Sequence, residues 1–271
     1  MTTLSERCAE IAIGDARYQI ASDDEYLSAL GSAFEPHTTA LFRALLKPGA
    51  VVADIGANIG CTSILFSQRA RRVLSFEPSP TTFRYLERNI RNAGIRNVEL
   101  HNLALGSEPG NSSLTFAPTN RAGGFVSDKT IASAGHVTES ITIRRLDDIV
   151  ESLDIDATDL IKIDVEGFEQ SVLEGGRNTI QRFQPVVALE LNHWCLNALH
   201  RICVPDFLDF LCSMFPILMA VEGATYLDVR DPKERYIVMY HHINHFRYTN
   251  LVAGFSRAQL ADFLHQYHHS S

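Results

Sequence analysis

The segment most able to bind a ligand is a short loop that combines glycines with an acidic residue. Its sequence, Asp54-Ile-Gly56-Ala-Asn58-Ile-Gly60, lies between a β-branched run that predicts a buried strand and a segment that predicts a helix. Gly56 and Gly60 allow backbone conformations with positive φ and a close approach to a ligand. The following helix directs its free N–H groups toward the same place. We therefore expect a ligand site at the tip of this strand.

The composition of the loop favours S-adenosylmethionine (SAM) over a dinucleotide. A dinucleotide loop has the pattern G-x-G-x-x-G, whose second glycine admits a pyrophosphate, whereas Asn58 stands between the two glycines here. Asp54 would repel a pyrophosphate but suits the sulfonium and ammonium groups of SAM. Glu77 ends the next predicted strand, where its carboxylate can accept hydrogen bonds from both hydroxyls of an adenosine ribose. A tight turn without a ligand and a dehydrogenase site are the alternatives.

A second group of polar residues is suited to act on a methyl acceptor. Asp164 ends one predicted strand, and Glu190, Asn192 and His193 lie at the end of the next. Because neighbouring parallel strands end at the same edge of a sheet, we expect these side chains to lie near the methyl group. A hydroxyl acceptor must lose its proton, and we predict His193 or Asp164 as the general base, with Glu190 orienting a partner. An ordinary loop histidine and a turn-capping aspartate are the alternatives.

Metal binding is an alternative to the main prediction, which is a site without a metal. The oxygen atoms of Asp164, Glu190 and Asn192 would suit Mg²⁺, which would hold a deprotonated hydroxyl beside the methyl donor. The three histidines within 241–245 resemble a metal cluster, but an exposed polar stretch is the preferred interpretation. The five cysteines are scattered without a C-x-x-C pair, so we expect neither a disulfide framework nor a cysteine zinc site.

The elements that must position these residues follow the order of an α/β protein with a mostly parallel sheet. Apolar strand-forming runs are predicted at 51–55, 72–77, 98–105, 160–164 and 185–191. Helices are predicted between them and after them, at 61–70, 81–93, 169–182 and 205–214. Two last runs, 217–221 and 236–240, are expected to form an antiparallel pair at one edge, followed by a helix over 256–267.

Residues outside this alternation are expected to cover the sheet. Residues 1–48 are predicted to form an N-terminal cap with a helix, and residues 49–271 a ligand-binding domain with an insertion near 110–145. Arg121 and the glycines that follow it are candidates for a flap that touches the substrate, with a plain surface loop as the alternative. Glu35 is a candidate to reach the cofactor from the cap helix.

Several sequence blocks, over about residues 34–193, resemble the FkbM-type SAM-dependent methyltransferases. The blocks are Val52–Gly60, Phe76–Pro80, Ala104–Ser107, Arg145–Asp148, Ile161–Glu169 and Pro185–Glu190. The resemblance implies a Rossmann-like class I methyltransferase fold: a seven-stranded, mostly parallel sheet with an antiparallel edge strand and a small N-terminal cap. It also implies methyl transfer to a hydroxyl of a sugar, polyketide or other secondary metabolite. N-methylation of a small-molecule amine and SAM binding without catalysis are the alternatives.

The resemblance also implies which residues contact SAM. They are Asp54, Gly56, Asn58, Gly60, Glu77, Pro78, Asn102, Ala104 and Asp164. The loop residues would line the methionine part and Glu77 the ribose, while Asn102 and Ala104 would flank the adenine. The segments before Gly49 and after His193 resemble the family less, and we expect them to encode the choice of acceptor.

The overall charge limits the kinds of partner. A formal net charge of −8 argues against non-specific nucleic-acid binding, which requires basic surface. The apolar runs are too short to span a bilayer, and the first residues lack the basic and apolar regions of a secretory signal. We therefore expect a cytoplasmic protein that acts on a small molecule, without nucleic-acid or membrane partners, and leave its oligomeric state open.

Overall fold

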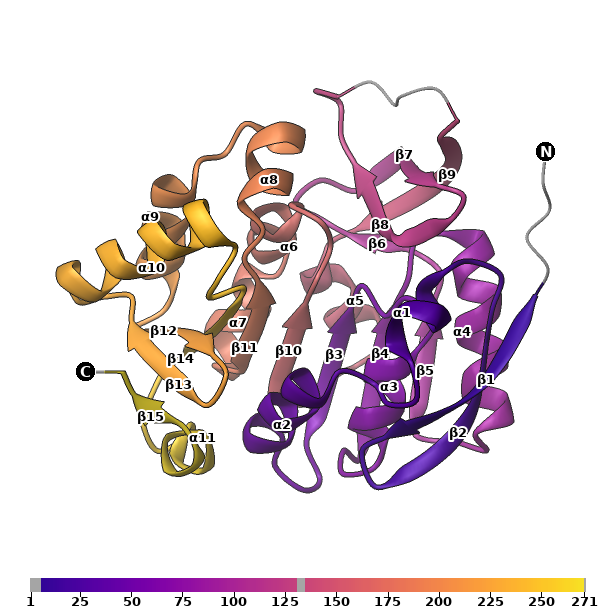
Figure 1. The fold of residues 1–271 in the computed structure, drawn as a ribbon, viewed down its shortest axis with the longest axis horizontal. Helices are drawn as coiled ribbons and strands as arrows, with labels where there is room; N and C mark the ends of the chain where they lie inside the picture. The colour runs from indigo at the N-terminus through magenta and orange to yellow at the C-terminus, as the bar shows by residue number, and fades with distance from the viewer. Residues whose placement is uncertain (1–5, 131–134, 271) are drawn as a thin grey trace.

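A central mixed sheet organises the chain (Figure 1). The computed structural model describes residues 6–130 and 135–270 of the 271. The strands that the described residues contribute to this sheet are, in spatial order, β15 (His268–His269), β13 (Thr225–Asp228), β12 (Ile217–Glu222), β14 (Asn250–Gly254), β11 (Val186–Glu190), β10 (Leu160–Ile163), β3 (Val51–Ile55), β4 (Arg72–Phe76) and β5 (Val98–His101). The strands from β11 to β5 are parallel, whereas β14 is antiparallel to both of its neighbours. The architecture is therefore α/β, as the alternation predicts.

The sheet is wider than the expected seven strands. It has nine strands within the described residues, because β13 and β15 extend it beyond β12. β12 and β13 form a hairpin in which Glu222 pairs with Thr225, and Gly223 in the turn has a φ of +59°. A two-residue loop of this kind needs positive φ, which glycine supplies without strain. The final strand β15 then pairs in parallel with β13.

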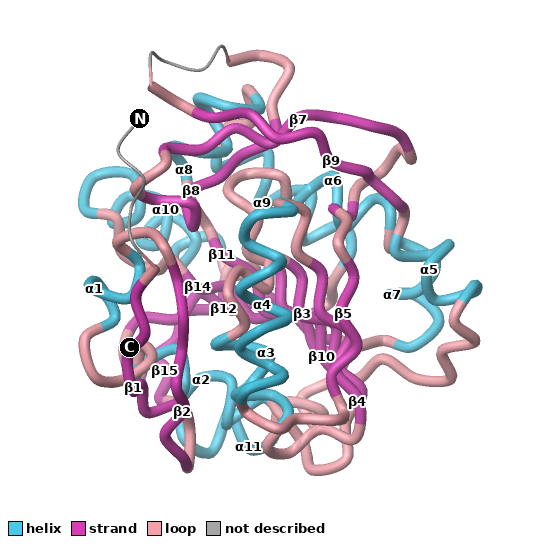
Figure 2. Tube along the Cα trace, turned by 90° about the vertical axis from the view of Figure 1, so that its right-hand side faces the viewer, coloured by secondary structure: helices cyan, strands magenta, loops and turns pink. Residues whose placement is uncertain are grey.

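Two apolar layers cover the faces of the sheet, because side chains alternate along each strand. One layer contains α2 (Pro36–Leu45), α3 (Cys61–Ser67), α4 (Pro80–Asn92) and α11 (Ala261–Gln266). The other contains α5 (Leu146–Ser152), α6 (Glu169–Gly175), α7 (Arg177–Phe183) and α9 (Val204–Met214). Figure 2 shows α3 and α4 on one side of the sheet and α5 and α7 on the other. Asp54 and Lys162 take the strand positions that face the first layer, two residues after Val52 and Leu160.

The prediction of a strand at 236–240 is wrong, since these residues lie within α10 (Pro232–His245). Asp231 caps the helix by accepting hydrogen bonds from the backbone N–H groups of Lys233 and Glu234, and Pro232 occupies its first position. The apolar run was misleading because most of its side chains face solvent while Val238 enters the core. The antiparallel strand is β14 instead, which the sequence analysis does not predict.

Two other expected elements are each divided into two. The strand expected over 98–105 ends at His101, and β6 (Ala104–Leu105) pairs with β9 (Val137–Arg144) in a different sheet. The helix expected over 169–182 is α6 followed by α7, with Gly175 and Gly176 at the junction. At Gly175 an added Cβ would lie 2.0 Å from the backbone oxygen of Gly106, so close packing requires glycine there.

Two segments far apart in the sequence lie over the carboxyl ends of the central strands (Figure 1). The first is α1 (Tyr26–Leu30), which follows the N-terminal hairpin of β1 (Arg7–Ile13) and β2 (Ala16–Ser22); the hairpin itself lies beside α4 in Figure 1. The second is a four-stranded sheet in which β6 and β9 are joined by β7 (Gly110–Ala117) and β8 (Asn120–Val126). Apolar residues of the hairpin belong to the same core as α3 and α4. Within the described residues no helix is long and apolar enough to cross a membrane.

Candidate functional site

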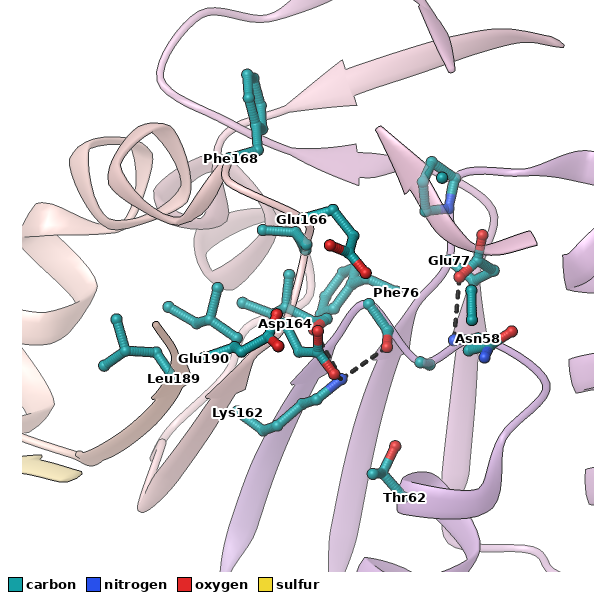
Figure 3. Close-up of a pocket in the computed structure, with 18 of the residues that line it drawn as sticks. Asn58, Thr62, Phe76, Glu77, Lys162, Asp164, Glu166, Phe168, Leu189 and Glu190 are labelled. Carbon is teal, nitrogen blue, oxygen red and sulfur yellow. Dashed lines mark hydrogen bonds and ion pairs between the residues drawn. The ribbon is translucent and has the colours of Figure 1, made fainter. Parts of the chain in front are cut away.

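A cavity of about 350 Å³ lies where β3, β10 and β11 end. The residues expected around a ligand that line it are Glu35, Gly56, Asn58, Glu77, Pro78, Ala104, Arg121, Asp164 and Glu190. Figure 3 shows Glu77 and Asn58 on one side of it and Asp164, Glu166 and Glu190 on the other. The expected residues Asp54, Gly60, Asn102, Asn192 and His193 are not part of its lining. The strand ends thus bring together most, but not all, of the predicted site.

The loop after β3 is shaped by glycine. Gly56 has a φ of +79°, and a Cβ added to it would lie 1.9 Å from the backbone oxygen of Asp164. Gly60, with a φ of +99°, begins α3 in the left-handed region. Asn58 also has positive φ (48°), which asparagine tolerates better than most residues. The backbone of the loop therefore borders the cavity directly at a position where a side chain does not fit.

Asp54 lies beneath this loop and is fully buried. Its Oδ2 accepts hydrogen bonds from the hydroxyls of Thr62 (2.7 Å) and Ser63 (2.6 Å) at the start of α3. Its Oδ1 is 3.5 Å from Nζ of Lys162, which stands directly opposite Asp54 in the β3–β10 register. The geometry therefore makes Asp54 a residue that fixes the loop from below, whereas the sequence analysis expects it to contact the ligand.

Lys162 is a site residue that the sequence analysis misses. Its Nζ donates hydrogen bonds to the backbone oxygens of Gly56 (2.7 Å) and Ile55 (3.2 Å), and it lies 3.5 Å from Asp164 Oδ2 (Figure 3). Burial alone would lower the pKa of this amine, but the carboxylates of Asp164 and Asp54 outweigh burial and raise it. The available signal was a lysine inside an otherwise apolar strand, which needs a buried partner.

Glu77 faces the cavity from the end of β4. It accepts hydrogen bonds from the backbone N–H groups of Asn58 (3.0 Å) and Ser79 (2.9 Å). Burial raises its pKa to about 7, although both N–H groups favour the ionised form. Nδ2 of Asn102 donates to the backbone oxygens of Glu77 (2.9 Å) and Pro78 (3.1 Å), so Asn102 supports the strand end from outside the cavity.

Three carboxyl groups meet at the other side of the cavity, at the ends of β10 and β11. The side chain of Asp164 is 50% exposed, whereas Glu166 accepts hydrogen bonds from Cys195 Sγ (3.0 Å) and Asn192 Nδ2 (3.4 Å). Oε2 of Glu190 is buried and has no hydrogen-bond partner among the described residues. Asn250, on the neighbouring strand β14, pairs with Glu190 in the sheet and also lines the cavity.

His193 is directed away from this group of carboxyls. It begins the short helix α8 (His193–Cys195), where its ring contacts those of His242 and Phe246 at centroid distances of 5.0 and 5.5 Å. Its backbone N–H donates to Nε2 of the buried His242 (3.2 Å). The geometry therefore brings Asp164 and Glu190 together in the cavity without His193.

Of the three residues expected for a magnesium site, Asn192 does not line the cavity. Oδ1 of Asn192 accepts a hydrogen bond from the backbone N–H of Cys195 (3.2 Å) and so caps α8, while its Nδ2 donates to Glu166. The positively charged amine of Lys162 lies 3.5 Å from Oδ2 of Asp164, one of the oxygens expected to bind Mg²⁺. Across the described residues, no group of three or more histidine, cysteine, aspartate or glutamate side chains is arranged to hold a metal ion, the histidines within 241–245 included.

The two overlying segments are tied together where they cover the cavity. The guanidinium of Arg121, on β8, forms an ion pair with Asp23 and lines the cavity. The backbone N–H of Arg121 donates to Asp24 (3.1 Å), and that of Glu25 donates to the oxygen of Thr119 (3.0 Å). Ser127, directly after β8, donates a hydrogen bond of 2.6 Å to the oxygen of Leu199 in the π-helix η1 (Leu196–His200). Hydrogen bonds and an ion pair therefore hold the segments that cover the cavity on both of its sides.

Replacing Glu190 by glutamine is expected to stabilise the ligand-free protein in a pH-dependent way. Burial, and then the charges of Asp164 and Glu166, raise the pKa of Glu190 from 4.5 to about 9. The folded protein therefore keeps a proton that the unfolded chain releases above about pH 4.5, so wild-type stability is lost as pH rises toward 9. We expect Glu190→Gln to raise the Tm by several degrees at pH 9 and hardly at all at pH 5.

Differential scanning calorimetry at both pH values measures this effect. The control is Glu151→Gln, at the exposed end of α5, which should leave the Tm unchanged at either pH. An equal Tm difference between Glu190→Gln and wild type at pH 5 and pH 9 would contradict the raised pKa.

Comparison with known proteins gives matches to methyltransferases. The family model of the methyltransferase FkbM domain matches residues 54–210, more than half of the chain. The hexuronic acid methyltransferase AglP of Haloferax volcanii is 29% identical over 185 residues, which cover 68% of this chain and 73% of AglP. Methyltransferase 1 of Beauveria bassiana is 30% identical over 142 residues, covering 46% of this chain and 57% of that protein.

A further relative is the 31-O-demethyl-FK506 methyltransferase FkbM of Streptomyces tacrolimicus, 31% identical over 160 residues. That alignment covers 48% of this chain and 60% of the relative, so the chain spans less than two thirds of this protein and of Methyltransferase 1. Among solved structures, a methyltransferase FkbM from Methylobacillus flagellatus is 21% identical with a TM-score of 0.44, over 62% of this chain and 38% of that one.

Proposed function

The chain belongs to the FkbM methyltransferase family and is a SAM-dependent methyltransferase, and we propose that its acceptor is a hydroxyl group of a small molecule. The observation that carries the proposal is the match over residues 54–210, which includes the glycine loop and the carboxyl groups of Glu77, Asp164 and Glu190. Relatives named a hexuronic acid methyltransferase, a 2-O-methyltransferase and a 31-O-demethyl-FK506 methyltransferase support a small-molecule acceptor and transfer to oxygen.

The residues of the cavity fit SAM. When bound, SAM supplies a methyl group that its positively charged sulfur already activates. Glu77 presents a carboxyl to the cavity while two backbone N–H groups hold it in place, which suits a pair of ribose hydroxyls. Glycine at position 56 lets the loop pack directly against the backbone of Asp164, where any side chain would collide. Asn58 and Ala104 line the same wall.

Asp54 is proposed to act on the cofactor indirectly. Because it is fully buried and holds Thr62, Ser63 and Lys162, it fixes the start of α3 and the loop above it. Lys162 in turn binds the backbone oxygen of Gly56. The two charged residues therefore stabilise the wall against which the cofactor binds.

Asp164 is proposed as the general base. Its half-exposed carboxylate lines the cavity at the end of β10, and its Oδ2 is 3.5 Å from Nζ of Lys162. The Asp164 carboxylate would take the hydroxyl proton of the acceptor, and Glu190 would orient the acceptor from β11. Holding both reactants in line is expected to supply several kcal/mol of the rate enhancement. His193, which does not line the cavity, is not needed for this chemistry.

Transfer of a labelled methyl group tests the proposal. The full chain is incubated with methyl-labelled SAM and separate pools of sugars, polyketides, amines and RNA, and labelled products are identified by mass spectrometry. We expect label on a hydroxyl of a small molecule. We also expect an unchanged rate with excess EDTA, because Asn192 caps α8 and the ammonium group of Lys162 lies beside Asp164. Label found only on RNA or only on an amine would contradict the proposal.

A further inference from the structure

The large apolar side chains that are exposed gather on one helix. Seven occur among the described residues, and five of these lie in α10 and at the residue that directly follows it. The five are Tyr236, Ile237, Tyr240, Ile243 and Phe246, with exposed fractions from 40% to 64%. Figure 1 shows α10 at the outer edge of the molecule, beside β12 and β13. Such a concentration, which we call the α10 face, is typical of an interaction surface.

The opposite side of α10 is already fixed to the rest of the protein. Val238 and His242 are fully buried, and Nε2 of His242 accepts a hydrogen bond from the backbone N–H of His193 (3.2 Å). Arg235 forms an ion pair with Asp209 of α9 (2.7 Å). These contacts hold the helix in place without its outer side, so the α10 face is free to bind another molecule.

The α10 face has the residue spacing of a helix–helix contact. Tyr236, Tyr240 and Ile243 follow one another at intervals of four and three residues, which places them in one stripe along the helix. The rings of Tyr236 and Tyr240 are stacked with their centroids 6.4 Å apart. Tyr240 lies at the middle of the stripe, with one member about a turn away on either side. An antiparallel copy of α10 can therefore pack against it, with Tyr240 beside Tyr240 and Tyr236 beside Ile243.

The charge pattern favours a second copy of this chain over a membrane. No aspartate, glutamate, lysine or arginine occurs between Arg235 and Arg247, although these four types make up 21% of the chain. Residues near a two-fold axis meet their own copies, so a charge there would face a like charge. A membrane-binding helix instead carries several free lysines or arginines. Here Arg235 and Arg247 form ion pairs with Asp209 and Glu222, and the net charge of −8 opposes anionic lipid.

The area of the α10 face is sufficient for most of a dimer interface. An aromatic side chain has about 150–250 Å² to bury, so the five side chains, each about half exposed, present roughly 400 Å² together. A stable interface buries about 800 Å² on each partner, of which about 65% is apolar in homodimers. The apolar area needed is thus roughly 500 Å² per copy, and the α10 face supplies most of it.

We infer that two copies of this chain form a dimer through the α10 face, with their α10 helices antiparallel and Tyr240 at the two-fold axis. The inference concerns assembly and does not depend on the proposed function. It predicts an unusual response to salt, because two copies with a net charge of −8 repel each other while the α10 face has no ion pair to screen. Added salt should therefore strengthen the dimer.

Sedimentation equilibrium of the full chain tests the inference. We expect a dimer with a Kd below about 10 µM, as an interface of this size allows, and a lower Kd at about 500 mM than at about 50 mM NaCl. Tyr240→Glu places two like charges at the axis and should raise the Kd at least about thirtyfold, as does the loss of a central aromatic contact. Circular dichroism should show an unchanged fold, because Tyr240 is exposed.

A charge exchange tests the position of the axis. Tyr240→Lys alone should be monomeric like Tyr240→Glu, whereas an equimolar mixture of the two variants should form dimers because opposite charges then meet. Gln181→Glu, at an exposed position of α7, is the control and should leave the Kd unchanged.

Several results would overturn the inference. They are a monomeric wild type, a dimer that Tyr240→Glu leaves intact, a mixture of the two variants that stays monomeric, and a dimer that salt weakens. Co-sedimentation of the wild type, but not of Tyr240→Glu, with vesicles of equal parts phosphatidylcholine and phosphatidylserine would instead assign the α10 face to a membrane. Each result leaves the proposed function unaffected, since methyl transfer is measured separately.

Discussion

Replacing Lys162 by methionine is expected to lower the free energy of unfolding by about 3–5 kcal/mol. The amine of Lys162 is the counter-charge closest to the buried Asp54, and methionine fills a similar volume without that charge. The carboxylate of Asp54 would remain fully buried, with only the hydroxyls of Thr62 and Ser63 as partners. Urea denaturation followed by circular dichroism measures the change.

Two variants separate the charge from the volume of the side chain. The double variant Asp54→Asn/Lys162→Met removes the orphaned charge and should recover at least half of the loss. Lys233→Met, an exposed lysine of α10, should change stability by less than about 0.5 kcal/mol. A loss below about 1 kcal/mol for Lys162→Met would show that the ion pair is not essential to the fold.

Replacing Asp164 by asparagine is expected to lower kcat by about 10²- to 10⁴-fold, the range typical of a lost general base. The side chain is half exposed, and asparagine keeps its shape, so the fold and the affinity for S-adenosylhomocysteine should change little. Single-turnover kinetics with a saturating acceptor measure the chemical step, and calorimetry measures the affinity of the cofactor product.

Comparison with His193→Ala decides between the two bases that the sequence suggests. His193 packs against His242 and Phe246 outside the cavity, so its removal should change kcat by less than about threefold. Asp262→Asn, at an exposed position of α11, is the control for a change of charge alone. If His193→Ala loses as much activity as Asp164→Asn, the assignment of the base to Asp164 is wrong.

The alternation of apolar runs predicts the parallel part of the sheet because β3, β4, β10 and β11 are buried on both faces. Both the apolar runs and the glycine loop that identifies the site are patterns of neighbouring residues, so the sequence alone reveals them. The resemblance to the FkbM family is confirmed by the match over residues 54–210. The edge beyond β11 is less predictable, since the apolar run at Tyr236–Tyr240 lies on an exposed helix face while the short run at Asn250–Gly254 enters the sheet.

The roles within the site depend on contacts that are distant in the sequence. Lys162 opposes Asp54 through a register between strands about a hundred residues apart, and no local pattern specifies that register. The direction of His193 depends on α8 and on His242, which follows it by 49 residues. Residue types therefore predict where the site lies, whereas the tertiary structure is needed to assign a role to each of its carboxyl groups.

The position of β14 has a consequence for how the protein can be produced and divided. β14 lies between β11 and β12, although it follows both in the sequence, so the hydrogen-bonding edge of β11 stays uncovered until residue 254 has been synthesised. A fragment limited to the family match at 54–210 would leave that apolar edge open to pairing with other chains. Premature termination between β11 and β14 should thus yield an aggregating product rather than a shorter enzyme.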